Sequence, residues 1–322
     1  MVNPIKTGIY GQLMKAVKQL NPSETDAEAK RRFTIALAGN SSEEVDLLRS
    51  VFLGPSPSDD EISKSASVLK RCEFLLDETS AKSLQEAEII LIHPGVDIHT
   101  ESFKGDTYMF DPERPDDTLK SIIASGAGSD LKLAIGARFP ALRTEISRGV
   151  LRGVARENAV FAITTALGNV APSIIQPFLG VAEAAGDMVI LTSNQIRMMF
   201  MIGAVYGSEI GFKSQWKEVT SIIGSAFGWR ALARELVSKI PFGGGLAPKG
   251  AIAYAGTTVI GEGLIFFYTT GRQMTRKETA EAFKKAYSDA VGVVRSLLER
   301  FRPSASALGK GNGPGESGKG SD

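Results

Sequence analysis

Residues able to hold a metal ion gather in one loop of the chain. His93, Asp97 and His99 lie there together with Glu101, and they include both histidines of the protein. Imidazole and carboxylate groups are the usual ligands of transition metals, so His93, Asp97 and His99 are candidate metal ligands. The alternative is that a loop after a strand collects polar residues for solvation. Since the one cysteine, Cys72, adds no thiolate cluster, we predict no cofactor.

The turn after residues 33–38 has the position of a phosphate-binding loop but not its composition. A P-loop reads G-x-x-x-x-G-K-[ST]; its backbone amides and lysine cradle phosphate, and its hydroxyl holds magnesium. Here the chain reads GNSSEEVD, without the lysine or the second glycine. The three carboxylates suit the positive end of a helix and would repel a triphosphate. Nucleotide binding in the usual mode is therefore not expected, and the remaining candidate contacts are Gly39, Asn40, Ser41 and Ser42.

Two further GTPase motifs are incomplete. The apolar run at 88–93 continues as IILIHPGVD, where Gly95 matches the glycine of the magnesium-binding motif and His93 stands near its aspartate. No asparagine-lysine-x-aspartate motif follows residues 131–136. The strand, glycine turn and helix ending LLRSVFLG nevertheless resemble the start of an Era- or dynamin-like GTPase. The resemblance implies a degenerate GTPase-like module, with a divergent GTP-binding enzyme as the alternative.

Glycines recur at four-residue spacing in the apolar second half of the chain. Small residues four apart let two helices approach closely, in a bilayer or in a tight soluble bundle. Carboxylates within these segments are costly in lipid unless they are paired or face a cavity. They indicate either a membrane-buried polar seam that pairs with Arg197, or amphipathic helices with a solvated edge. The candidate packing or membrane residues are Gly203, Gly207, Gly211, Gly224, Gly228, Asp187, Arg197 and Glu262.

A basic stripe precedes the first apolar segment. Arg148, Arg152 and Arg156 recur every four residues and so share one helix face. Such a stripe is typical of a helix that faces lipid headgroups on the cytoplasmic side. It is equally typical of an ordinary solvated face, because Glu145 and Glu157 lie beside it.

Two apolar segments raise the question of a membrane. Residues 158–182 carry no charge, and residues 250–271 carry only Glu262. Segments of this length can cross a bilayer, although Pro172 and Pro177 interrupt the first. The formal net charge of +1 provides no global field for nucleic acid, so no nucleic-acid partner is expected.

These residues lie on a predicted α/β module followed by an all-α domain. Strands are predicted for the short apolar runs 33–38, 88–93 and 131–136, and helices for 42–53, 60–77 and 115–124. Their alternation implies βαβ units and a small parallel sheet covered on both faces. The predicted divisions are an amphipathic helix with linker at 1–32, the pseudo-GTPase-like module at 33–140, the apolar helical domain at 141–301 and a disordered tail at 302–322.

Residues 138–271 resemble the YcjF-like family, a helical domain of unknown function found fused to or beside Era- or dynamin-like GTPases. The resemblance rests on FPALR at 139–143, ARENAVFAITTALGNVAP at 155–172, the pattern Asp187-x7-Gln195 followed by MMFMIGAVYG at 198–207, and GTTVIGEGLIFFY at 256–268. It implies a bacterial protein associated with the inner membrane, and it supplies no catalytic residues.

The sequence therefore predicts a non-catalytic, membrane-associated scaffold or regulator at the cytoplasmic face of the inner membrane. Its expected partners are the membrane and an active GTPase or a second copy of the chain. Two alternatives stay open: a divergent GTP-binding enzyme, and a soluble cytoplasmic helical module that binds other proteins.

Overall fold

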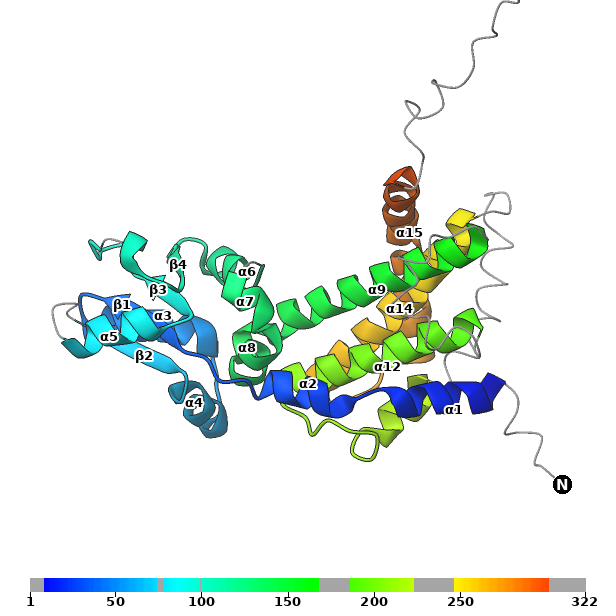
Figure 1. Ribbon diagram of the computed structural model, residues 1–322, viewed down its shortest axis with the longest axis horizontal. Helices are drawn as coiled ribbons and strands as arrows, with labels where there is room; N and C mark the ends of the chain where they lie inside the picture. Colours follow the sequence, from blue (N-terminus) through cyan, green and yellow to red (C-terminus); the bar gives the residue numbers. More distant parts are fainter. Residues whose placement is uncertain are drawn as a thin grey trace, which may run out of the picture.

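A computed structural model describes residues 9–73, 78–98, 100–124, 126–167, 186–222 and 246–300. The predicted tail at 302–322 lies outside the described residues. Within them, a small α/β module is followed by a bundle of long helices (Figure 1).

The α/β module is built on a four-stranded parallel sheet. Its strands are β1 (Ile35–Gly39), β2 (Leu69–Glu73), β3 (Ile89–Ile92) and β4 (Asp106–Met109), in the order β2-β1-β3-β4. The register places Ile35 opposite both Leu69 and Ile89. The chain moves outward from β1 to β2 and then returns to the other side of β1 as β3. In doubly wound sheets a crevice opens at such a reversal, beyond the carboxyl ends of the strands.

Both faces of this sheet are buried, as expected for parallel strands. Ile35, Leu37, Ile89 and Leu91 join a large core with α3 (Ser42–Leu53), whereas Ala36, Ala38, Ile90 and Ile92 belong to a smaller cluster on the opposite face. The other helices of the module are α4 (Asp59–Ala66), α5 (Glu78–Glu86), α6 (Pro115–Ala124) and α7 (Gly126–Asp130), with a short 3-10 turn η2 (Thr100–Ser102).

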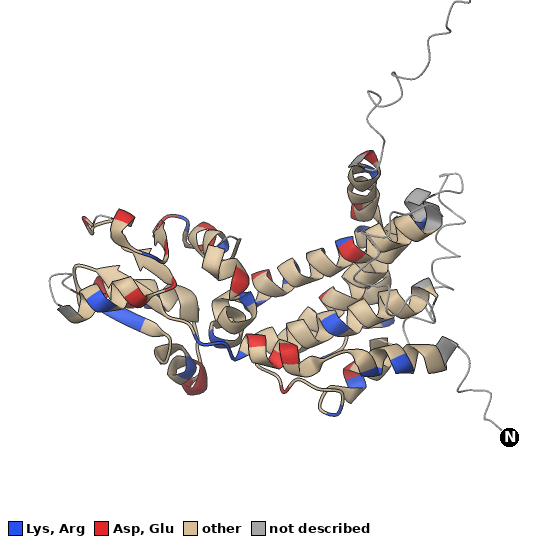
Figure 2. Cartoon of the chain, viewed as in Figure 1, with Lys and Arg blue, Asp and Glu red and all other residues tan. Residues whose placement is uncertain are grey.

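The bundle contains α9 (Arg143–Leu167), α12 (Asp187–Val205), a helix at 216–222, α14 (Leu246–Thr270) and α15 (Arg276–Arg300). Helix α14 packs between α9 and α15. It runs antiparallel to α9, because Gly250 approaches Ile163 while Gly261 approaches Leu151. Charged residues are sparse along α12 and α14, whereas α15 and the α/β module carry many of both signs (Figure 2).

The N-terminal helices belong to the bundle rather than forming a separate linker. Helices α1 (Ile9–Gln19) and α2 (Pro22–Ala29) pack on α12, and α2 also contacts α8 (Lys132–Arg138). The short 3-10 turn η3 (Pro140–Leu142) then joins α8 to α9. One buried core runs from the sheet through Phe139 into α12, so the predicted boundary at 140 divides a continuous core.

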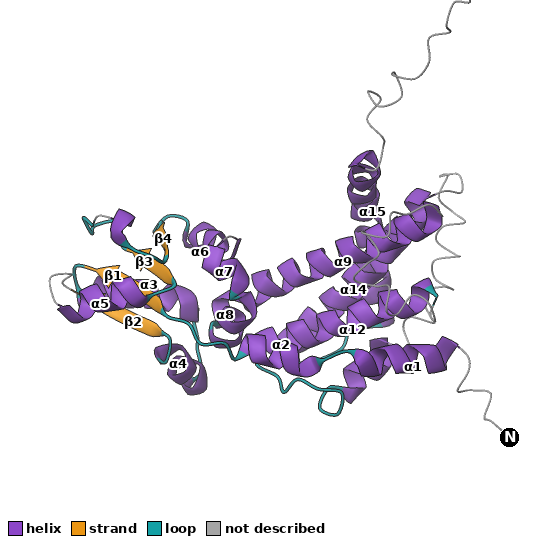
Figure 3. Ribbon diagram, in the orientation of Figure 1, coloured by secondary structure: helices purple, strands orange, loops and turns teal. Residues whose placement is uncertain are grey.

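The parallel sheet and the helical second half are confirmed, but two local predictions are wrong and one strand was not predicted (Figure 3). Residues 131–136 form no strand; α8 occupies them, and its Gly136 meets Val205 of α12. The helix predicted at 60–77 ends at Ala66 and gives way to β2, whose buried Cys72 lies on a strand. Strand β4 was not predicted. For a short run with a mixed pattern, the elements that it packs against decide whether it becomes a strand or a helix.

Candidate functional site

The candidate site is the turn between β1 and α3. Strand β1 ends at Gly39, and α3 begins at Ser42 with Ser41 as its N-cap. The Ser41 hydroxyl accepts a hydrogen bond from the backbone N–H of Glu44 at 3.3 Å. The helix therefore begins only three residues after the strand ends, and its own cap uses the amide of Glu44. This leaves a short, capped turn in place of a long phosphate-binding loop.

A carboxylate of the chain itself fills the position next to this turn. Oε2 of Glu44 accepts a hydrogen bond from the backbone N–H of Asn40 at 2.7 Å and lies 3.3 Å from Nδ1 of His93. Gly39 permits the close packing, since a Cβ at that position would lie 3.0 Å from Cβ of Glu44. The N-terminus of a helix favours an anion. Here Glu44 supplies that anion.

The same group of residues closes the point where the sheet order reverses. The Asn40 side chain donates a hydrogen bond from Nδ2 to the Gly95 carbonyl at 2.7 Å. This bond links the carboxyl end of β1 to the loop after β3, and the contact between His93 and Glu44 links the same two places. The crevice in which doubly wound sheets bind ligands is thus crossed by internal contacts.

A second charged cluster ties the start of α3 to the end of β2. The Ser42 hydroxyl donates to Oε2 of Glu73 at 2.6 Å, and the Arg71 guanidinium pairs with both Asp46 and Glu73. The hydrogen bond from Arg71 holds the pKa of Asp46 below its ordinary value. The bonds from Ser42 and then Arg71 do the same for the pKa of Glu73. These carboxylates therefore stay ionised and bound to the protein.

The candidate metal ligands form no cluster in the described residues. His93 is directed to Glu44, Asp97 is exposed, and His99 lies outside the described residues. Where side chains are described, no group of three histidine, cysteine, aspartate or glutamate residues is arranged to hold a metal ion.

The predicted glycine stripe is not one helix face. Helix α12 ends at Val205, Gly207 follows in the left-handed conformation with φ +73°, and Gly211 lies in the loop beyond. Gly203 is in the tightest contact of the three, since a Cβ there would lie 2.4 Å from Nε2 of Gln215 and 3.0 Å from the Tyr268 hydroxyl. The expectation of overlapping helix-packing motifs is wrong because the helix stops before the second glycine. Gly224 and Gly228 lie outside the described residues.

The predicted polar seam is at the surface of the bundle. Arg197 pairs with Glu157 of α9, and both side chains are nearly half exposed. Glu262 lies 4.0 Å from Arg148, also at a partly exposed position. Asp187 is the first residue of α12. The pairs Arg197–Glu157 and Arg148–Glu262 thus lie at a solvated edge of the helices, which is the alternative to a membrane-buried polar seam.

The basic stripe is exposed along α9. Arg148, Arg152 and Arg156 are all solvent-accessible, and Arg152 pairs with Glu145 at 2.8 Å. Glu145 and Glu157 therefore flank the stripe at its two ends, and the net charge of this surface is smaller than the arginines alone indicate.

A neutral polar network inside the bundle was missed. Nδ2 of Asn158 donates to the Thr257 hydroxyl at 2.8 Å, and Oδ1 of Asn158 accepts from Asn194 at 2.8 Å. Gln195 donates to the same Thr257 hydroxyl at 3.2 Å. All four side chains are buried, and they connect α9, α12 and α14. The sequence signal for this network is the presence of isolated amide side chains within apolar segments. Buried amides in native proteins are hydrogen-bonded, so each of them predicts a polar partner nearby.

Two helices are long and apolar enough to cross a membrane by length and composition: Met188–Val205 in α12 and Lys249–Thr270 in α14. Buried core helices of soluble proteins meet the same criterion, and 83% of the first segment is buried inside the structure against 56% of the second. The sequence matches no protein-family model, no curated protein and no solved structure.

Proposed function

We propose that this protein is a non-catalytic scaffold or regulator that works at the cytoplasmic face of the inner membrane. In this proposal a degenerate GTPase-like module provides a docking surface for an active GTPase or a second copy of the chain. The YcjF-like helical domain provides membrane association.

The observation that carries the proposal is the Glu44 carboxylate in the turn after β1. It bonds to the backbone N–H of Asn40 at 2.7 Å, so the anion-binding amide of the turn already has an internal partner. A bound triphosphate would have to displace that carboxylate, and the turn offers no lysine to stabilise the added charge. A module of this kind keeps its shape without nucleotide.

Membrane association is supported by α14. Its apolar segment spans Lys249–Thr270 and is only partly buried by the rest of the protein. Fractionation of native membranes tests this part: the protein should resist an alkaline carbonate wash and enter solution with detergent. Recovery in the soluble fraction without detergent would overturn it.

Calorimetric titration of the full chain with magnesium and GTP tests whether the protein binds nucleotide. No binding heat is expected. Micromolar affinity that disappears when Ser41 and Ser42 are changed to alanine would instead establish the divergent GTP-binding enzyme.

A soluble helical binding module is the second candidate, and one observation favours it. The Arg197–Glu157 pair lies part-way along α12, where a membrane-spanning helix would place two charges in hydrocarbon. This candidate predicts a monodisperse protein in buffer without detergent.

A further inference from the structure

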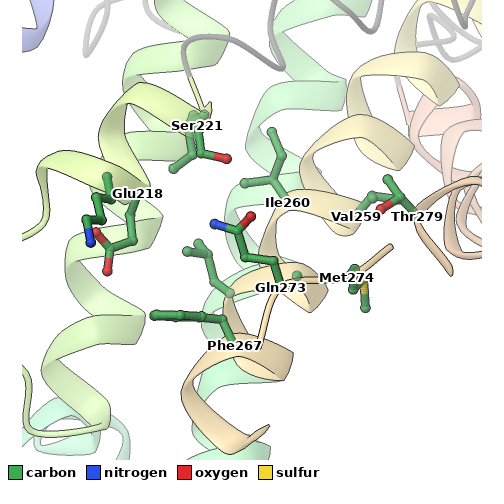
Figure 4. A pocket seen from close by; sticks show the side chains of 12 residues that line it. Glu218, Ser221, Val259, Ile260, Phe267, Gln273, Met274 and Thr279 are labelled. Carbon is green, nitrogen blue, oxygen red and sulfur yellow. The ribbon is translucent and has the colours of Figure 1, made fainter. Parts of the chain in front are cut away.

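A groove of about 410 Å³ runs between the 216–222 helix, α14 and the start of α15 (Figure 4). Its walls are largely apolar and include Ile260, Leu264 and Phe267 of α14. The polar residues are at the side of the groove formed by the 216–222 helix and by the loop after α14. Small-molecule sites in proteins have this volume and this combination of an apolar interior with few polar groups.

The depth of the groove depends on a glycine. Val259, Gly263 and Phe267 follow one another at four-residue spacing, so they form a strip about 12 Å long on one face of α14. Apart from its two chain neighbours and the backbone of its own helix, no described atom lies within 4 Å of the position that a Cβ of Gly263 would take. A larger side chain at this position would therefore project into the groove and fill it.

The polar side of the groove carries both signs of charge. Lys217 and Glu218 are adjacent on the 216–222 helix, and both line the groove. Figure 4 shows Glu218 on one wall and Gln273 on the other, with the Gln273 amide directed into the space between the helices. This arrangement is net neutral but strongly dipolar. It matches a ligand head that carries one negative and one positive group.

We propose that this groove binds a zwitterionic single-chain phospholipid. The acyl chain lies along Ile260, Leu264 and Phe267 over Gly263, the phosphate meets Lys217, and the ammonium group meets Glu218. A straight hydrocarbon chain fits a narrow apolar strip on one helix, and the headgroup fits the paired charges at its side. The proposal goes beyond the scaffold function, because it does not depend on the turn after β1.

The test is calorimetric titration of the full chain with dodecylphosphocholine kept below its critical micelle concentration. Saturable binding to a single site is expected. The variant Gly263→Leu should lose measurable binding, because leucine fills the groove. The control Gly292→Leu should bind like the wild type, because Gly292 lies on the exposed surface of α15 with open space around it. Lys217→Glu should weaken binding about tenfold by removing the phosphate contact.

Circular dichroism and urea unfolding show whether each variant is folded. If Gly263→Leu does not fold, Ser221→Trp blocks the groove from the opposite, exposed wall and should abolish binding in the same way. The absence of saturable binding to the wild type would overturn the proposal, as would wild-type affinity in both blocking variants. Equal affinity for dodecyl maltoside, unaffected by Lys217→Glu, would overturn the zwitterionic assignment.

Discussion

The turn after β1 and the interior of the bundle deal with polar groups in opposite ways. At the turn, the carboxylates of Glu44, Asp46 and Glu73 pair with Arg71, His93 or backbone amides and remain in contact with water. Inside the bundle, the buried network that joins α9, α12 and α14 is made by the side-chain amides of Asn158, Asn194 and Gln195 and the hydroxyl of Thr257.

The difference follows from solvation. A carboxylate at the edge of a sheet keeps part of its hydration and gains a helix N-terminus or a guanidinium, so its ionised form is stable. A carboxylate at the centre of an apolar bundle would lose its hydration without a compensating charge. Amides can saturate one another at little cost and still fix which helices meet. In the α/β module, charged side chains therefore connect the ends of the strands at the surface. In the bundle, neutral hydrogen bonds determine which helices pack together.

The strongest way to break this comparison is to introduce a charge into the bundle. Asn158 is fully buried, so Asn158→Asp should lower the free energy of unfolding by about 3–5 kcal/mol, because its described hydrogen-bond partners are all neutral. Urea unfolding followed by circular dichroism measures the change. The neighbouring surface control Glu157→Gln should cost less than about 1 kcal/mol, and an equal loss in both would contradict the solvation argument.

Helix packing gives the next effect, which a comparison of two glycines with different surroundings measures. A Cβ on Gly261 would lie 2.4 Å from Cδ1 of Leu151, so Gly261→Ala should destabilise the protein by about 1–3 kcal/mol. On the facing helix α9, Gly153 is exposed with open space around it, and Gly153→Ala should stabilise by up to about 1 kcal/mol. Thermal and urea unfolding of the two variants should move in opposite directions.

Removing the internal anion of the turn should have a smaller effect on stability. Glu44→Ala loses the hydrogen bond to Asn40 and the contact with His93, for an expected cost of about 1 kcal/mol. Ser50→Ala on the exposed side of the same helix should stay within about 0.5 kcal/mol of the wild type. A Glu44→Ala variant as stable as the wild type would show that the carboxylate does not support the turn.

The smallest effect concerns pH. The pKa values of Asp46 and Glu73 are lowered in the folded protein, so their contribution is present above the pKa of the unfolded chain and is lost as the pH falls. Unfolded carboxyls titrate near pH 4, so the loss should begin at about pH 5 and continue below pH 4. Arg71→Met should flatten this part of the curve of urea midpoint against pH. A curve parallel to that of the wild type would contradict the role of Arg71.

The outline of the fold was readable from residue pattern alone. The apolar runs at 33–38 and 88–93 correspond to β1 and β3, because continuous apolar strands are typical of the centre of a parallel sheet. Edge strands β2 and β4 lack that signal: Lys70 and Arg71 are exposed in the middle of β2. The run at 131–136 was assigned the wrong type, since a short apolar run does not distinguish a strand from a buried helix.

The residue types of the turn were also readable, but their contacts were not. The sequence shows Glu44, Val45 and Asp46 where a P-loop has its second glycine, lysine and hydroxyl residue. Glu44 accepts a hydrogen bond from Asn40 and lies close to His93. This arrangement depends on β1 and β3 being neighbours in the sheet, and no local sequence pattern predicts that pairing.

By itself, the sequence determined a parallel α/β module, a mainly helical second half and a turn whose charge opposes a triphosphate. These properties depend on residue type and on spacing along one strand or helix. The tertiary structure alone decided that the N-terminal helices join the bundle, that α8 is a helix, and that Asn158, Asn194, Gln195 and Thr257 meet. Each of these outcomes depends on contacts between residues far apart in the chain, and such contacts form only when the elements pack together.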